Sequence, residues 1–335
     1  MGDFDMSCDR SAVLRSFLGW PISASVAIRS WLLRILFFAL ISCLGPALCL
    51  QAEEILQPDA ERAFEYLERI CAIGPRISGT PGMEQQQALI KDHFTQLGAE
   101  VRFQAFDVPH PQTGQPVRMN NIVVAWHPER MERVLVSCHY DSRPYPDKEP
   151  LPINRTKSFI GANDGGSGVA LLMELGHQMP HVNSRLGIDF VLFDGEELVY
   201  REGDKYFHGS EYFSKAYRDQ PDRKVQYKKG ILLDMVAGRE MKVYMEGNSL
   251  RYARSITNRV WDIAQQLGVR EFIARRKHEV RDDHLPLNQI ARIPTCDIID
   301  FDYPYWHKRN DLPAACSGES MAKVGSVVLA WLSEN

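Results

Sequence analysis

Short apolar runs recur along this chain, and a polar residue that can bind a metal follows several of them. The run Ile188–Phe193 is apolar except at Asp189, which is typical of a strand buried on both faces of a parallel sheet. Two adjacent glutamates, Glu196 and Glu197, follow this run. Ligands of open α/β sheets bind beyond the carboxyl ends of the strands, so we expect both glutamates at a functional edge of the sheet.

Other residues of this kind occupy comparable positions. They are His139 after the run Val134–Cys138, Asp164 in a glycine-rich turn before a helical segment, Asp234 at the end of Gly230–Asp234, and His307 after Cys296–Trp306. Parallel strands deliver their carboxyl ends to one edge, so we expect these side chains to converge. Imidazoles and carboxylates without a thiolate suit a catalytic Zn²⁺. Taken singly, an aspartate after a strand is often only a helix cap or a turn residue.

The spacing of apolar residues predicts an alternation of helices and strands. Helices are expected over 57–71, 83–97, 169–178, 250–267 and 319–333, and strands over 99–106, 121–125, 134–138, 188–193, 230–234 and 242–245. A polar insertion over 142–157 and a loop over 198–208 interrupt this pattern. We therefore expect a single α/β domain with a mostly parallel central sheet flanked by helices on both faces.

The N-terminal segment differs in kind from the rest of the chain. Arg29 and Arg34 precede an apolar stretch over 35–50, and polar residues follow it, as in a secretory signal. The stretch is short for a membrane span and contains Pro46, although an uncleaved anchor, or lipoprotein cleavage before Cys43, remains an alternative. We expect residues 1–52 to be a leader and residues 53–335 to be the catalytic domain. We also expect the protein to be secreted or periplasmic, with membrane contact only through an uncleaved leader.

Composition excludes several classes of function. A net charge of −4 gives no basic footprint for nucleic acid. The cysteines after the leader, Cys71, Cys138, Cys296 and Cys316, show no Cys-x-x-Cys spacing, which excludes a cysteine-rich zinc site. The sequence does not pair these four cysteines in disulfides.

Five segments together resemble the ordered motifs of the zinc aminopeptidase and glutaminyl cyclase superfamily, which acts on peptide N-termini. They are His139–Asp141, Asn163–Gly168, Phe193–Glu197, Leu233–Met235 and Trp306–His307. The resemblance implies that Asp164, Glu197 and His307 bind a first zinc ion and that Glu196 is the general acid and base. In the two-metal aminopeptidases, the residues matching His139 and Asp234 hold a second zinc ion, with the counterpart of Asp164 as the bridge.

The resemblance favours the cyclase branch, which uses one zinc ion. Asp282 lies in a stretch similar to the cyclase Asp-Asp-His-Ile-Pro, Trp306 precedes the zinc histidine as in cyclases, and the loop after Glu197 is long. The resemblance to cyclases implies that Glu196, Asp234 and Asp282 share protons in one hydrogen-bond network. It also implies that Trp306 packs on the substrate. We expect a glutaminyl-peptide cyclotransferase that converts N-terminal Gln to pyroglutamate and releases ammonia.

Two features favour the aminopeptidase branch instead. The loop over 198–208 contains no Trp, whereas animal cyclases carry one there, and the turn Asp164–Gly168 is closer to the aminopeptidase pattern. A secreted aminopeptidase with two zinc ions is therefore the alternative. A binding domain with an inactive site is a third reading, although the complete set of ligands and Glu196 argue against it.

Overall fold

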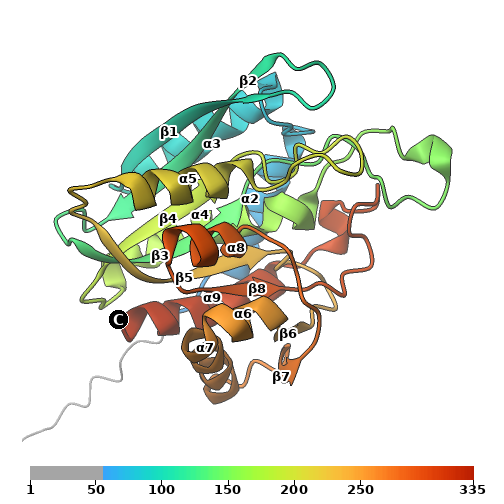
Figure 1. The fold of residues 1–335 in the computed structure, drawn as a ribbon. Coiled ribbons are helices and arrows are strands. Elements are labelled where there is room, and N and C mark those ends of the chain that lie inside the picture. The colour runs from blue at the N-terminus through green and yellow to red at the C-terminus, as the bar shows by residue number, and fades with distance from the viewer. Residues whose placement is uncertain (1–55) are drawn as a thin grey trace, which may run out of the picture. The chain divides into compact units, whose positions relative to one another are not determined.

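A six-stranded sheet with the strand order β1-β2-β4-β3-β5-β8 runs through residues 56–335, the part of the chain that the computed structural model describes (Figure 1). The expected leader, residues 1–52, lies outside the described residues and stays a prediction. None of the helices between residues 56 and 335 has both the length and the apolar character that a membrane crossing requires.

The strands of the main sheet are β1 (Glu100–Pro109), β2 (Pro116–Trp126), β3 (Glu132–His139), β4 (Gly187–Phe193), β5 (Gln226–Asp234) and β8 (Thr295–Ile299), and a small second sheet pairs β6 (Val243–Met245) with β7 (Phe272–Arg276). The helices are α2 (Ala60–Ala72), α3 (Pro81–Gln96), α4 (Gly168–Gln178), α5 (His208–Asp219), α6 (Gly247–Tyr252), α7 (Arg254–Gln266), α8 (His284–Pro286) and α9 (Gly318–Ser333). The predicted α/β fold is confirmed.

The main sheet is mixed: most of its strand pairs are parallel, as predicted, and β2 is the strand that runs the other way. β3 pairs in parallel with both β4 and β5, and β5 pairs in parallel with β8. β2, by contrast, pairs antiparallel with both β1 and β4. The reason is the short connection between β1 and β2, which only an antiparallel hairpin can use, whereas the parallel strands are joined through helices. The predicted site therefore belongs to the parallel part of the sheet.

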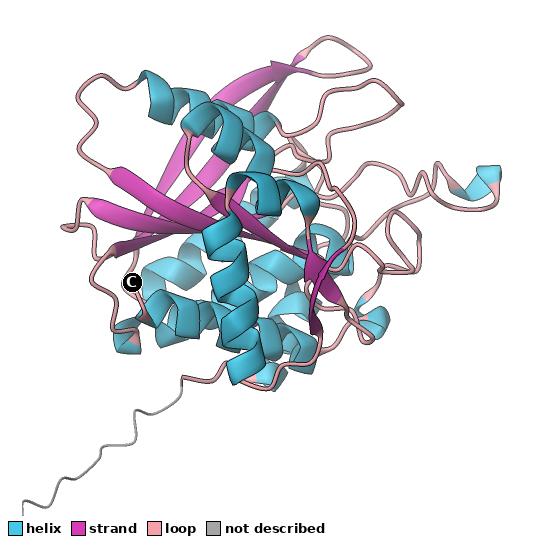
Figure 2. Ribbon diagram, turned by 60° about the horizontal axis from the view of Figure 1, so that its bottom comes forward, coloured by secondary structure: helices cyan, strands magenta, loops and turns pink. Residues whose placement is uncertain are grey.

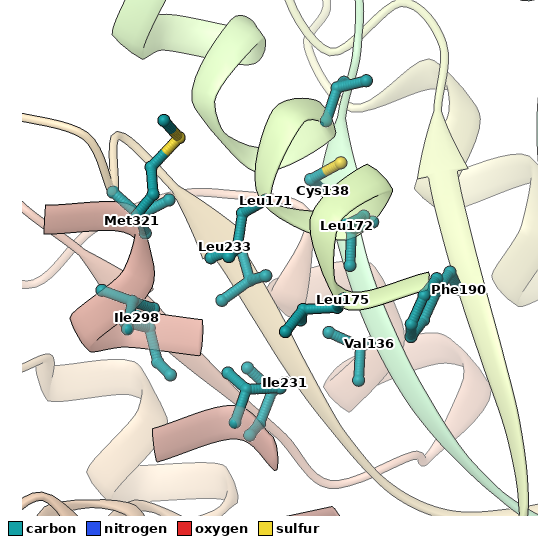
Figure 3. Packing of buried hydrophobic residues seen from close by; sticks show 14 of the residues in the cluster. Val136, Cys138, Leu171, Leu172, Leu175, Phe190, Ile231, Leu233, Ile298 and Met321 are labelled. Atoms are coloured by element: carbon teal, nitrogen blue, oxygen red, sulfur yellow. The ribbon is translucent and has the colours of Figure 1, made fainter. Parts of the chain in front are cut away.

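Alternating side chains of the strands form two cores, one on each face of the sheet. Val136 and Cys138 of β3 and Phe190 of β4 point toward Leu171, Leu172 and Leu175 of α4, as Figure 3 shows. On the opposite face, the intervening residues Leu135 and Val191 pack with Phe213 of α5. This alternation is the two-residue period of a strand, and it places helices on both sides of the sheet (Figure 2).

Two predicted elements differ from the structure. The expected helix over 250–267 is two helices, because Ala253 has φ −135° and ψ 34°, which interrupts the helical path between α6 and α7. Glu246 caps the N-terminus of α6, where its carboxylate accepts hydrogen bonds from the amides of Asn248 and Ser249. Within the apolar run Cys296–Trp306, strand β8 ends at Ile299, so His307 lies in the loop between β8 and α9 and not directly after a strand.

Candidate active site

The predicted site residues come together at the carboxyl ends of the parallel strands. His139 is the last residue of β3, Asp234 is the last residue of β5, and Glu196 and Glu197 follow β4. Asp164 lies in the irregular helical turn Ala162–Ser167 that leads into α4. Convergence of residues that are far apart in sequence is therefore confirmed as a feature of the fold.

Asp164, Glu197 and His307 form the first of two triads of possible metal ligands. His307 Nε2 lies 3.6 Å from Asp164 Oδ2 and 3.4 Å from Glu197 Oε1. All three side chains are buried. This is the set of residues that the sequence predicts for the first zinc ion.

His139, Asp164 and Asp234 form the second triad. His139 Nε2 lies 3.3 Å from Asp164 Oδ1 and 3.2 Å from Asp234 Oδ1. Asp164 thus turns one carboxylate oxygen toward each triad. This is the geometry expected of a bridging ligand, and both predicted triads are present as groups of neighbouring side chains.

The first triad fits a zinc ion by chemistry and by spacing. Asp164 Oδ2 and Glu197 Oε2 are buried oxygens without a hydrogen-bond partner in the described structure, and such atoms are costly unless something binds them. A tetrahedral ion with bonds of about 2.0–2.1 Å separates its ligand atoms by about 3.4 Å. The separations of 3.4 and 3.6 Å in the first triad agree with that value.

All predicted site residues except His139 line one cavity of about 370 Å³. His139 lies behind the cavity wall, where Asp164 and Asp234 contact it. Trp306 forms part of the wall and packs against Phe301, with the two ring centroids 5.0 Å apart. The Lys148 ammonium lies 5.5 Å from the Trp306 ring centroid. The cavity thus combines an acidic floor with an aromatic wall.

Burial and like charges shift the pKa values of the carboxyls in the cavity. Burial, and then the charge of Glu197, raise the pKa of Glu196 well above its usual range. Burial, and then the charge of Asp234, likewise raise the pKa of Asp282 well above its usual range. For Glu197, burial acts to raise the pKa, but His307 and Arg143 outweigh it and lower the pKa. The two adjacent glutamates therefore differ in proton affinity: Glu196 binds a proton more readily than Glu197 does.

Buried aspartates hold the turns that carry the candidate metal ligands. The Asp141 carboxylate accepts hydrogen bonds from the backbone amides of Glu196 and Glu197 at 3.1 and 2.9 Å. The Asp311 carboxylate accepts from the amides of Asn163 and Asp164 at 2.8 and 3.1 Å. Each turn is thus fixed through its backbone, and the carboxylates of the candidate ligands stay available.

One glycine in the turn beside Asp164 is required by its surroundings. Gly165 has φ +81°, and an added Cβ would lie 2.5 Å from the backbone oxygen of Asp141 and 3.0 Å from the His139 ring. Any side chain at this position would push against two segments of the site. The glycine-rich turn therefore allows Asp164 to approach His139 closely.

Sequence reasoning missed Arg143, Asp147 and Tyr206, which also line the cavity. Arg143 Nη1 donates to Glu197 Oε1 at 2.9 Å, and Asp147 Oδ1 lies 2.9 Å from His307 Nδ1. Arg143 and Asp147 belong to the polar insertion, and Tyr206 to the loop after Glu197. No periodicity or motif marks these positions, because their contacts depend on loop paths.

Comparison with known proteins accounts for this arrangement. The family model described as Peptidase family M28 matches residues 121–332, a range that contains every predicted site residue. The chain belongs to peptidase family M28. The chain is 42% identical in sequence to a glutaminyl cyclase of Fimbriiglobus ruber, and the match to its crystal structure covers 84% of this chain and 97% of that one with a TM-score of 0.81.

Proteins with other names are also similar to this chain. A leucine aminopeptidase precursor from Bacteroides thetaiotaomicron is 30% identical, and the match covers 84% of this chain and 99% of that one with a TM-score of 0.79. The glutaminyl-peptide cyclotransferase of Drosophila melanogaster is 25% identical over 261 residues, 71% of this chain and 70% of that one. The predicted superfamily is confirmed, and the similar proteins include more than one glutaminyl cyclase.

Proposed function

We propose that the protein is a zinc-dependent glutaminyl-peptide cyclotransferase that converts the N-terminal Gln of peptides or proteins to pyroglutamate. The observation that carries this proposal is the position of Asp282, a buried carboxyl that lines the same cavity as Glu196 and Asp234. Such a group of carboxyls can hold and pass a proton, which a cyclisation between an amine and an amide requires. The similarity to several glutaminyl cyclases supports the same reading.

Glu196 is the proposed acid and base of the reaction. Its carboxylate accepts a proton from the substrate's α-ammonium group, and the freed amine forms a bond to the carbonyl carbon of the Gln side chain. Glu196 then delivers a proton to the amide nitrogen, whose bond to that carbon breaks so that ammonia leaves. Asp234 and Asp282 take up the second proton lost by the attacking nitrogen, and Trp306 packs on the substrate.

Asp164, Glu197 and His307 would hold the zinc ion. When bound there, zinc supplies a Lewis acid that polarises the side-chain carbonyl of the substrate. The buried, unpartnered oxygens of Asp164 and Glu197 are the structural support for this assignment.

A secreted zinc aminopeptidase is the second candidate, because the triad of His139, Asp164 and Asp234 would complete a two-metal site. In that case Glu196 would act as the base toward a water molecule. The structural similarity to the aminopeptidase precursor of Bacteroides thetaiotaomicron supports this alternative.

A combined assay of zinc content and activity tests the proposal. The purified protein is expected to hold one zinc ion per chain and to release ammonia from a Gln-initiated peptide, with a pyroglutamyl product in the mass spectrum. Two zinc ions together with hydrolysis of an aminoacyl anilide would overturn the cyclase assignment in favour of the aminopeptidase. Absence of both activities from the zinc-loaded protein would favour an inactive binding domain.

We also propose that the enzyme is exported, on the basis of the basic and apolar segments within residues 29–50. Fractionation of expressing cells and sequencing of the mature N-terminus test this proposal. Recovery of the full-length chain in the cytoplasm would contradict it.

A further inference from the structure

The chain segment that follows β3 contacts the metal-binding region at several successive points. His139 ends the strand as a member of the second triad, and Asp141 holds the backbone of the two glutamates. Beyond them, the polar insertion turns back toward the cavity and brings Arg143 and Asp147 to its wall. Neither residue belongs to a ligand triad, so their contacts need a separate explanation.

Arg143 joins Glu197 to Asp147. Besides its hydrogen bond to Glu197 Oε1, its guanidinium places Nε 2.9 Å from Asp147 Oδ1 and donates from Nη2 to the Tyr206 hydroxyl at 3.2 Å. The Arg143 side chain is only 5% exposed. A buried guanidinium has a rigid planar arrangement of donors, so it fixes the carboxylates that it contacts. Glu197 Oε2 meanwhile stays without a hydrogen-bond partner.

Asp147 reaches the far side of the His307 ring. Its Oδ1 lies 2.9 Å from Nδ1, while Nε2 faces Asp164 and Glu197. A carboxylate at Nδ1 keeps the proton on that nitrogen and leaves the Nε2 lone pair for a metal. The amide of Lys148 also donates to the backbone oxygen of His307 at 3.2 Å.

The backbone of His307 makes such support necessary. Its φ of +53° lies in the left-handed region, which non-glycine residues adopt at a cost and keep only where the surroundings hold them. His307 also lies in a loop rather than on a strand, so the sheet alone does not fix its ring.

We propose that Arg143 and Asp147 are positioning residues for the metal centre, with Asp147 orienting the His307 imidazole and Arg143 orienting Glu197 and Asp147 together. This inference rests on the metal site of the proposed function and extends it to two residues outside the ligand set. The competing role for the same contacts is structural: the two residues would only anchor the polar insertion to the rest of the domain. The two roles differ in what a substitution changes.

Zinc affinity and the stability of the metal-free protein distinguish the two roles. We expect Asp147→Ala and Arg143→Met each to weaken zinc binding by about 10- to 100-fold, the range found for outer partners of metal ligands. Asp147→Asn keeps the size of the side chain and should weaken binding less. Zinc affinity is measured by competition with a chromophoric chelator, and the melting temperature of the metal-free protein by calorimetry.

Glu279→Ala is the matched control. Glu279 also lines the cavity, forms ion pairs with Arg251 and Arg276, and has a side chain 47% exposed against 42% for Asp147. It contacts no member of either triad among the described ion pairs and hydrogen bonds. Its substitution should leave zinc affinity unchanged.

The outcomes separate this inference from the proposed function. Weaker zinc binding in Asp147→Ala with an unchanged metal-free melting temperature supports positioning, as does an altered visible spectrum of the cobalt-substituted Asp147→Asn protein. Wild-type zinc affinity in both Asp147→Ala and Arg143→Met overturns this inference alone and leaves the cyclase proposal intact. A wild-type protein that binds zinc but releases no ammonia overturns only the cyclase proposal, whereas one that binds no zinc overturns both.

Discussion

The carboxylate of Asp141 accepts a hydrogen bond from the backbone amide of Glu197 at 2.9 Å, and its other oxygen accepts from the preceding amide at 3.1 Å. Asp141 is fully buried and does not line the cavity. It therefore shapes the turn that carries the proposed base and a proposed ligand without contacting the substrate.

Replacing Asp141 by Asn should damage the fold and the metal site together. Asn offers one acceptor oxygen, so its amino group would face one of the two backbone amides and leave that amide unpaired. An unpaired buried donor costs about 1–3 kcal/mol. We expect Asp141→Asn to lower the free energy of unfolding of the metal-free protein by that amount and to weaken zinc binding, as measured by urea denaturation and chelator competition. Asp302→Asn, at an exposed position, is the control.

Glu196→Gln should abolish catalysis and leave zinc bound. The glutamine cannot take up the α-ammonium proton, and general acid–base groups contribute about 10²- to 10⁴-fold to rates. Because Glu196 belongs to neither triad, the zinc content should match that of the wild type. The measurements are ammonia release and elemental analysis on the same sample. Activity that survives this change would show that the base is misassigned.

Metal removal and His139→Ala together should report how many ions the reaction needs. A chelator should abolish activity, and added zinc should restore it. In a one-zinc cyclase, His139→Ala should leave the zinc content near one per chain, because His139 lies outside the first triad. A fall from two ions to one, with loss of anilide hydrolysis, would instead identify the aminopeptidase.

Trp306→Ala should weaken substrate binding more than it slows the chemical step. Its indole forms part of the cavity wall, and the loss of an apolar contact of about 1–2 kcal/mol corresponds to roughly a tenfold rise in KM. Trp306→Phe keeps an aromatic wall and should change KM less. A tenfold loss in kcat at unchanged KM would argue against a role of Trp306 in substrate binding.

Glu246 should make stability depend on pH. Burial raises its pKa, but His284 and the amides of Asn248 and Ser249 outweigh burial and bring the pKa to about 2. Because the folded-state pKa is depressed, the stabilisation is complete above about pH 4.5 and is lost as pH falls toward about 2. At about 1.4 kcal/mol per unit of pKa shift, we expect Glu246→Gln to cost on the order of 3 kcal/mol near neutral pH.

Urea denaturation at about pH 7 and about pH 3.5 tests this dependence. The loss caused by Glu246→Gln should shrink at the lower pH. Glu279→Gln, at an exposed position, should have a small effect at both. An equal loss for Glu246→Gln at both pH values would show that the carboxylate charge does not matter.

Sequence reasoning could predict the parts of the site that the sheet positions. His139 and Asp234 end strands, and Glu196 and Glu197 follow one, so the apolar runs before them fix where they emerge. Parallel pairing of β4, β3 and β5 then brings them to one edge. The order of these residues along the chain also gave the resemblance to the zinc aminopeptidase and glutaminyl cyclase superfamily.

The remaining features depend on loop paths and tertiary contacts. The break at Ala253 lies in a stretch without glycine or proline, so periodicity predicts one long helix there. The contacts of Arg143 and Asp147 depend on how the polar insertion turns back toward His307. The reversed direction of β2 was not predicted, because apolar runs predict strands but do not give their direction.

Asp164, which turns one oxygen toward each triad, also bears on how reactions diverge within this fold. Because the two triads share this carboxylate, substitutions at His139 and Asp234 would remove the second triad while the first stayed whole. Such a change requires no new strand, loop or domain. A hydrolase and a cyclase can therefore be separated by few substitutions, and the arrangement makes the interconversion of the two by directed evolution a realistic experiment.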